Sequence, residues 1–178
     1  MPNHIRNVWR IKNVTPDKID YLLNKLTVSY SPDGSDDLLQ ILDFDLVIPE
    51  PRYIQDCPKE FRVNKDSHVS EDKNRPWFNW YTWHVTNWGT KWNTYDGYTK
   101  VGKTYITFVF STAWSFAEPI AHKLAQLGYD LDLRFADEAL GSNCGKCLYN
   151  SKTKEWTTYY EPELPNPEQF AKYIWNNY

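Results

Sequence analysis

Alternation of apolar and polar side chains is the strongest pattern in this chain, and it predicts strands that bury one face. Residues 129–136 show it best, because an aliphatic or aromatic side chain occupies every second position and acidic residues or arginine lie between them. In the first predicted strand, alternate positions from Ile5 to Ile11 are expected to be buried. Similar patterns predict the other strands, at residues 4–13, 38–47 and 104–112, and a hairpin at 148–149 and 156–160 around a turn at 150–154.

Apolar residues that recur three and four positions apart predict two amphipathic helices between these strands. The first begins at Pro16, and Thr15 before it is a favourable N-cap residue. The second begins at a capping box formed by Ser115 and Glu118. It is expected to end at Gly128, because glycine is the usual residue after a helix C-terminus.

Two further helices are predicted from less regular patterns. Residues 77–88 place aromatic side chains along one stripe and are followed by Gly89, which indicates a short helix with a glycine stop. A C-terminal helix begins after Asn166, an N-cap residue followed by proline. Its predicted buried face consists of Phe170, Tyr173 and Ile174.

The order of these elements predicts an α+β fold. A strand, a helix and a strand are followed by an aromatic helix, then by strand, helix, strand, strand and helix. This mixture favours a mostly antiparallel sheet with helices on one face, formed by residues 1–178 as a single domain. Residues 49–75 interrupt it, because they are polar, contain three prolines and have no sustained period. We interpret this stretch as an irregular insertion.

Composition restricts the class of protein. The chain has 178 residues, of which 41% are hydrophobic and 24% charged, so it can bury a core and is not disordered. It has no apolar run near the roughly 20 residues that span a bilayer, and its N-terminus lacks the apolar segment of a secretory signal. Three cysteines, an odd number, are not a disulfide framework. We therefore expect a cytoplasmic protein without a membrane partner.

Aromatic content is the most unusual feature of the composition. The chain contains nine tryptophans, and five of them fall within residues 77–92. Residues 73–104 also carry five basic side chains and one acidic side chain, although the whole chain has a net charge of -3. Exposed aromatic rings beside cations can stack bases and contact phosphates, and tryptophan and tyrosine also dominate protein–protein hot spots. This stretch is therefore the candidate binding surface, with either nucleic acid or a protein as the partner.

The candidate binding residues come from this stretch and from the end of the strand at 104–112. Large aromatic side chains on a helix are more often part of the core, so burial is the alternative interpretation for several of them. The polar residues around Gly89 offer either a recognition pocket or a turn that satisfies its own backbone. The predicted set is Trp83, His84, Asn87, Trp88, Lys91, Trp92, Asn93 and Trp114.

Catalytic and metal-binding motifs are sparse. Cys144 and Cys147 have the spacing of half a zinc site, but no second pair exists, so we expect two free thiols and no cofactor. Asp137 and Glu138 follow the strand at 129–136 and could act with His84 and Lys91 in an enzyme. Neighbouring residues of a strand point to opposite faces, which disfavours a carboxylate pair. A solvated strand end is the alternative interpretation.

Four blocks of sequence resemble a known family. They are the opening Met-Pro-Asn, the block Asn-Trp-Gly-Thr-Lys-Trp-Asn at 87–93, the block Phe-Val-Phe-Ser-Thr-Ala-Trp-Ser at 108–115, and Asp137 with Glu138. Together they resemble phage- and plasmid-encoded proteins that contain a YubB-like ferredoxin-like domain, a domain of unknown function. The likeness covers residues 1–13 and 77–138, and His4 stands where the family has a bulky residue. The resemblance implies a ferredoxin-like fold and a mobile-element origin, and it assigns no catalytic residues.

These observations together predict a non-enzymatic accessory protein of a phage or plasmid that binds a host macromolecule in the bacterial cytoplasm. Its most specific form is a counter-defence inhibitor similar to anti-CRISPR proteins. The alternatives are a single-stranded nucleic-acid-binding protein and a nucleic-acid-processing enzyme that uses His84, Lys91, Asp137 and Glu138. The sequence predicts neither the identity of the partner nor the oligomeric state.

Overall fold

The structure, a computed structural model, describes residues 3–32, 34, 36, 38–55 and 80–178. Its centre is a six-stranded sheet in the order β4-β5-β1-β6-β7-β8, in which every neighbouring pair is antiparallel. A separate hairpin contains β2 and β3. The strands are β1 (His4–Lys12), β2 (Thr27–Tyr30), β3 (Leu39–Leu42), β4 (Tyr95–Val101), β5 (Tyr105–Ala113), β6 (Asp130–Asp137), β7 (Cys144–Asn150) and β8 (Glu155–Tyr160).

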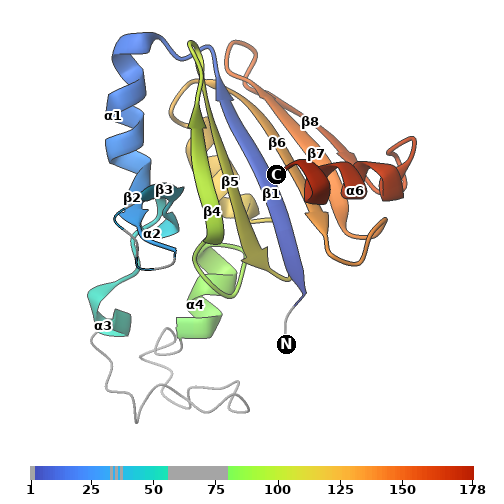
Figure 1. Cartoon of the computed structure of the whole chain (residues 1–178), viewed down its shortest axis with the longest axis horizontal. Coiled ribbons are helices and arrows are strands. Elements are labelled where there is room, and N and C mark those ends of the chain that lie inside the picture. Colours follow the sequence, from blue (N-terminus) through green and yellow to red (C-terminus); the bar gives the residue numbers. More distant parts are fainter. Residues whose placement is uncertain (1–2, 33, 35, 37, 56–79) are drawn as a thin grey trace.

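Helices lie on both faces of this sheet (Figure 1). The long helix α1 and helix α5 contribute to the core on one face, and α6 crosses the other. The units β1-α1-β4 and β5-α5-β6, with β1 and β5 side by side in the middle, form the ferredoxin-like arrangement that the sequence predicts. The helices are α1 (Pro16–Leu26), α2 (Phe44–Val47), α3 (Arg52–Gln55), α4 (Trp80–Asn87), α5 (Glu118–Ala125) and α6 (Pro167–Asn177). No helix among the described residues is long and apolar enough to cross a membrane.

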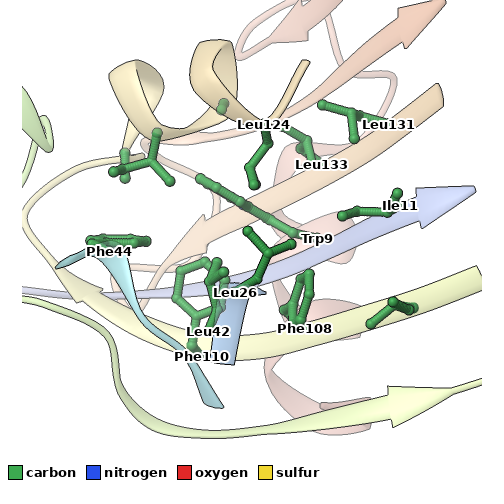
Figure 2. Close-up of a cluster of buried hydrophobic side chains, with 14 of the residues drawn as sticks. Trp9, Ile11, Leu26, Leu42, Phe44, Phe108, Phe110, Leu124, Leu131 and Leu133 are labelled. Carbon is green, nitrogen blue, oxygen red and sulfur yellow. The ribbon is translucent and has the colours of Figure 1, made fainter. Parts of the chain in front are cut away.

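Trp9 occupies the centre of the larger core (Figure 2). Its indole is fully buried and lies 5.1 Å from the Phe110 ring and 5.2 Å from the Phe116 ring, measured between ring centroids. Alternate positions of β1 from Ile5 to Ile11 are buried with it, as predicted. Removing such an aromatic side chain from a core typically costs about 3–5 kcal/mol, so Trp9 is a major source of stability.

A second, smaller core lies under α6. Ala171 and Ile174 of this helix pack against Val8, Ala136 and Cys144 of three adjacent strands. Asn166 caps the helix as predicted, because its side-chain oxygen accepts a hydrogen bond from the Gln169 backbone N–H at 3.0 Å. The prediction that Tyr173 is buried is wrong, since this side chain is exposed. Both faces of the sheet are therefore covered, although α6 covers only part of its face.

The strand predicted at 38–47 is wrong beyond Leu42. Asp43 accepts a hydrogen bond from the Asp45 backbone N–H at 2.8 Å and caps the single turn of α2. An aspartate side chain that bonds to its own local backbone competes with strand pairing, and here it turns the chain. Phe44 consequently enters the core from a helix, and Leu46, predicted to face inward, is exposed.

The capping box predicted at Ser115 is also wrong. The Ser115 hydroxyl donates its hydrogen bond to the Gly89 carbonyl, and α5 begins at Glu118 after Ala117, which makes no side-chain cap. A tertiary partner has replaced the local one. Thr15 precedes α1 at the predicted position but likewise makes no side-chain cap bond, although Pro16 starts the helix as expected.

Candidate binding surface

Helix α4 and the loop after it position most of the predicted binding residues. The described part of this helix begins at Trp80, so Trp77 and Phe78 lie outside the described residues. Gly89 ends the helix with a φ of 78°, a backbone conformation that glycine adopts without strain. The loop is then fixed to the end of β5, because the Thr90 hydroxyl donates to the Ala113 carbonyl at 2.7 Å and accepts from the Ala113 N–H at 3.1 Å.

Two of the predicted tryptophans belong to the core. Trp83 and Trp88 are buried, with their ring centroids 5.5 Å apart. The Trp88 indole N–H donates to the Ile48 carbonyl at 2.9 Å, which satisfies its polar atom inside the protein. Both rings therefore stabilise the attachment of α4 and leave little surface for a partner.

The two predicted asparagines also have structural partners. The Asn93 side-chain oxygen accepts from the backbone N–H groups of Phe44 and Thr94, and its amide nitrogen donates to Asp43 at 2.7 Å. Asn87 donates to the Trp83 carbonyl, one helical turn earlier. The polar groups of these two side chains therefore satisfy the local fold, which is the alternative to a recognition pocket.

His84 contacts a residue that the sequence did not indicate. Its ring stacks on the Trp88 indole at 4.0 Å between centroids, with 16° between the planes. Its nitrogens lie 2.9 Å from the Lys91 carbonyl and 2.9 Å from the Glu50 carboxylate. His84 therefore ties the start of the 49–75 stretch to the loop after α4.

The remaining predicted residues form an exposed aromatic patch. The Lys91 ammonium lies between two indoles, 4.7 Å from the Trp92 ring centroid and 5.1 Å from that of Trp114. These two side chains are 36% and 40% exposed. Tyr81 of α4 meets the Trp114 ring edge-on, with centroids 5.9 Å apart. We refer to Tyr81, Lys91, Trp92 and Trp114 as the indole patch.

Trp114 has a strained backbone. Its φ is 73°, in the left-handed region that costs a side chain with a Cβ about 1–2 kcal/mol. Hydrogen bonds hold it there: its N–H donates to the Asn3 carbonyl at 3.0 Å, and its carbonyl accepts from the Asn143 side chain at 3.1 Å. The fold therefore stabilises a strained residue whose large ring is exposed, and such strain is frequent at functional sites.

Two residues outside the predicted binding set, His4 and Tyr95, lie beside this patch. His4 Nδ1 lies 2.7 Å from the Tyr95 hydroxyl, which also donates to the Thr112 carbonyl at 3.1 Å. Because the hydroxyl proton is used there, the His4 nitrogen donates to the Tyr95 oxygen. Burial and the carboxylates of Glu138 and Asp96 raise the pKa of Tyr95 to about 12, so the phenol stays neutral at ordinary pH.

The side chains of the catalytic alternative belong to two separate groups of contacts. Asp137 is buried and accepts from the Asn143 side chain and the Ala139 backbone N–H. Glu138 accepts from the His4 backbone N–H at 3.0 Å. Among the hydrogen bonds and ion pairs of the described residues, none connects these carboxylates with His84 or Lys91.

The described basic residues of this stretch are divided between the indole patch and the far end of β4. Lys100 and Lys103 lie at and beyond that end, and Lys73 and Arg75 are outside the described residues. Lys91 is the cation of the patch as defined here. The carboxylates of Glu138 and Asp96 lie close to Tyr95 at its rim, where Asp96 pairs with Arg6 at 3.0 Å. Among the described residues, the surface is thus aromatic with mixed charge.

The two described cysteines form no disulfide and are buried. Their spacing of three along β7 directs the side chains to opposite faces of the sheet. Cys144 packs in the core under α6, and Cys147 belongs to the core around Trp9. Burial raises the pKa of both thiols. Within the part of the chain that is described, no group of three or more His, Cys, Asp or Glu side chains could hold a metal ion.

Comparison with known proteins gives one match. A family profile described as "Ferredoxin-like domain in Api92-like protein" matches residues 87–175, which is half of the chain and includes β4 to β8. No curated protein and no solved structure matches significantly. The matched region contains Lys91, Trp92 and Trp114, together with the strands that display them. The chain therefore belongs to the family of ferredoxin-like domains found in Api92-like proteins, a family of unknown function.

Proposed function

We propose that this chain is a non-enzymatic binding protein that holds a protein partner on the indole patch. The main support is Trp114, whose strained backbone keeps a large ring exposed beside Lys91 and Trp92. A fold selected for stability alone would place glycine or asparagine at that position. Tryptophan and tyrosine, the aromatic residues of this patch, are also among the side chains that contribute most to protein–protein hot spots.

Charge favours a protein partner over nucleic acid at this site. Nucleic-acid binding requires several cations that follow the phosphates, and the patch contains one, Lys91. Glu138 at its rim would repel a phosphate backbone, whereas Asp96 is paired with Arg6. The mixed charge instead suits a partner surface that has carboxylates for Lys91 and apolar side chains for the indoles.

The biological setting is inferred from resemblance. The sequence blocks at 87–93 and 108–115 resemble phage- and plasmid-encoded proteins, so we assign the chain to a mobile element acting in the bacterial cytoplasm. A partner in the host defence or replication machinery, as for a counter-defence inhibitor, would serve the needs of such an element.

Capture from a bacterial lysate with matched variants tests the proposal. The tagged wild-type chain is compared with Trp92→Ala/Trp114→Asn, which removes both indoles and places at position 114 a residue that tolerates positive φ. The control, Tyr21→Ala/Tyr159→Ala, removes two aromatic rings that are 56% and 42% exposed on α1 and β8. We expect a host protein bound by the wild type and the control to be lost from the indole variant.

Nuclease treatment and salt separate the alternatives. A complex that survives nuclease and changes little with salt supports a protein partner. Binding that disappears after nuclease treatment, or falls steeply with salt, would assign the patch to nucleic acid and contradict the proposal. Equal capture by the indole variant and the wild type would remove the patch from the interaction altogether.

A further inference from the structure

The sheet face that α6 crosses is covered only in part. The helix runs from β7, where the Cys144 thiol lies 3.8 Å from the Pro167 carbonyl oxygen, towards β4, where Lys100 lies 5.7 Å from the Tyr178 ring centroid. Figure 1 shows no helix in front of the sheet on the side where β1 ends and α1 begins. Side chains in the second half of β1 therefore face outward there, at the opposite end of the strand from the indole patch.

Basic side chains are concentrated on this open face. The strand register places Arg10 opposite Thr107 and Asp132, and Lys100 opposite Thr107 on the other side. Facing the same way along neighbouring strands are five cationic side chains and three anionic ones. The cations are Arg10, Lys12, Lys100, Arg134 and Lys146, and the anions are Asp130, Asp132 and Glu155. This excess of positive charge stands out on a chain whose net charge is -3.

Four of these cations have no carboxylate partner within 4.0 Å in the described structure: Arg10, Lys12, Lys100 and Lys146. Arg10 donates to the Thr107 hydroxyl at 2.9 Å and lies 4.6 Å from the Tyr105 ring centroid. Lys100 lies 5.0 Å from the centroid of the Tyr98 ring. Aromatic rings rather than acids contact Arg10 and Lys100, which leaves the charge of these two side chains available to a ligand.

Two of the three acids of this face, Asp130 and Asp132, are already engaged. Asp132 forms two hydrogen bonds with Arg134, both at 3.0 Å. Burial acts to raise the pKa of Asp132, but Arg134, Lys146 and Lys12 together bring it below its usual value. Asp130 accepts from the Ser151 backbone and hydroxyl, which lower its pKa. Neither carboxylate neutralises the four cations by direct contact.

A stacked ring and a hollow complete the surface. Tyr105 is 37% exposed, with the Arg10 guanidinium over its ring and Gly102 packed against it, so the guanidinium is the part of this pair on which a base can stack. A hollow of about 320 Å³ opens beside Lys12 and is also lined by Thr157 and by the carboxylates of Asp130 and Glu155. Lys146 lies in the row of Val8, closer to the part of the face that α6 covers.

We propose that this half of the sheet face binds single-stranded nucleic acid, independently of the indole patch. Cations spread over several strands can follow a phosphate backbone, and the Arg10 guanidinium held on the Tyr105 ring offers stacking that an acidic peptide would not use. Bases of a duplex are stacked inside the helix and cannot reach a flat sheet, so the single strand is the form that matches. We refer to Arg10, Lys12, Lys100, Tyr105 and Lys146 as the cationic face.

The test measures binding of a fluorescein-labelled thymidine oligonucleotide of about 15 nucleotides by fluorescence anisotropy over a range of salt concentrations. The variant Lys12→Gln/Lys100→Gln/Lys146→Gln removes three cations from the face. Its matched control, Lys18→Gln/Lys25→Gln/Lys123→Gln, removes three exposed lysines from α1 and α5 and has the same net charge. An abasic oligonucleotide of the same length measures the contribution of the bases.

We expect the wild type and the control to bind the thymidine strand with a strong salt dependence. Each phosphate contact contributes about -0.7 to the slope of log K against log salt, so the cationic-face variant should have a slope shallower by about 2. Tyr105→Leu, which keeps an apolar side chain, should weaken binding by about tenfold, the effect of one lost stack. The abasic strand should bind more weakly than the thymidine strand.

Several results would overturn this proposal. They are a wild-type chain that does not bind the thymidine strand, equal loss of binding in the cationic-face variant and its control, and equal affinity for the abasic strand. Loss of binding in Trp92→Ala/Trp114→Asn with full binding in the lysine variant would move the site to the indole patch. Failure of the lysate capture leaves this proposal unaffected, because the two sets of variants share no residue.

Discussion

Trp114 is the residue whose conformation is most at odds with stability. A tryptophan with a φ of 73° carries a strain that glycine would avoid, and its exposed ring recovers only part of that cost through Lys91 and Tyr81. Residues kept at a cost to stability are usually retained for function. Replacing Trp114 should therefore raise the stability of the fold and weaken the binding of the partner.

Trp114→Gly should raise the free energy of unfolding by about 1 kcal/mol, because glycine adopts this φ without the penalty of a Cβ. The same substitution should abolish capture of the protein partner. Urea denaturation measures the first effect, and the lysate assay measures the second. A variant that is less stable than the wild type would mean that the ring contributes more through packing than its backbone costs.

Tyr95 leads to a prediction about alkaline pH. Its pKa is raised by burial, by Glu138 and by Asp96 to about 12, whereas an unfolded tyrosine ionises near pH 10. Between these values the unfolded chain loses a proton that the folded chain keeps, so the free energy of unfolding falls as pH rises. Tyr95→Phe should lose less stability over this window than the wild type. Urea midpoints at about pH 9.5 and 11.5 measure the difference, and equal losses would contradict the assignment.

Exposure of individual residues could not be predicted from the local sequence. Trp83 and Trp88 share a stretch with Trp92, yet the first two are buried and the third is exposed. What separates them is contact with distant segments, such as the Ile48 carbonyl, which accepts from Trp88. The same holds for His84, whose partner Glu50 lies 34 positions away. A helical pattern identifies aromatic residues but not the segment that covers them.

Among secondary-structure elements, prediction succeeded where one face of the element meets a core. The alternation in β1 and β6 and the asparagine cap of α6 are all confirmed. β4 was missed, because its register shifts between Tyr95 and Tyr98 and Asp96 has positive φ, which breaks the alternation. The capping box failed because Ser115 found a better-placed acceptor in Gly89. Local rules thus fail where a tertiary hydrogen bond replaces a local one.

The junction between α4 and α5 allows a matched pair of substitutions. A Cβ at Gly89 would lie 2.7 Å from Pro119 Cδ, whereas a Cβ at Gly128 would meet no atom within 4 Å. Both glycines have similar positive φ, of 78° and 82°. Gly128→Ala should therefore cost only the backbone strain, about 1 kcal/mol, and Gly89→Ala should cost more through the added clash. Thermal unfolding of both variants measures the difference. Equal losses of stability in the two variants would show that the contact between Gly89 and Pro119 adjusts without strain.

For the whole molecule, the sheet is shared by two cores. The sequence predicted a buried face for the C-terminal helix but not the strands beneath it, because Val8 lies between Arg6 and Arg10 on its face of β1. Cys144 is buried by α6, while Cys147 on the same strand is buried from the opposite side. The reactivity of each thiol therefore reports on one of the two cores.

Ile174→Ala should loosen α6 without opening the larger core. Such a truncation typically costs about 2–5 kcal/mol, so modification of Cys144 by a thiol reagent should become at least about thirtyfold faster. Cys147 should react at the wild-type rate. Peptide mapping by mass spectrometry distinguishes the two sites. Faster modification of both cysteines would mean that the two cores unfold together.

Strand β1 connects the indole patch with the cationic face. It is hydrogen-bonded to β5 along its whole length and to β6 from Ile5 to Lys12. Its first residues lie near the indole patch, and its last residues contribute to the cationic face about 26 Å away. A doubly paired strand of this kind cannot stretch, so two ligands bound at its ends would keep a constant separation. The chain would then act as an adaptor of fixed span, holding a protein beside a nucleic-acid strand, with binding energies that simply add.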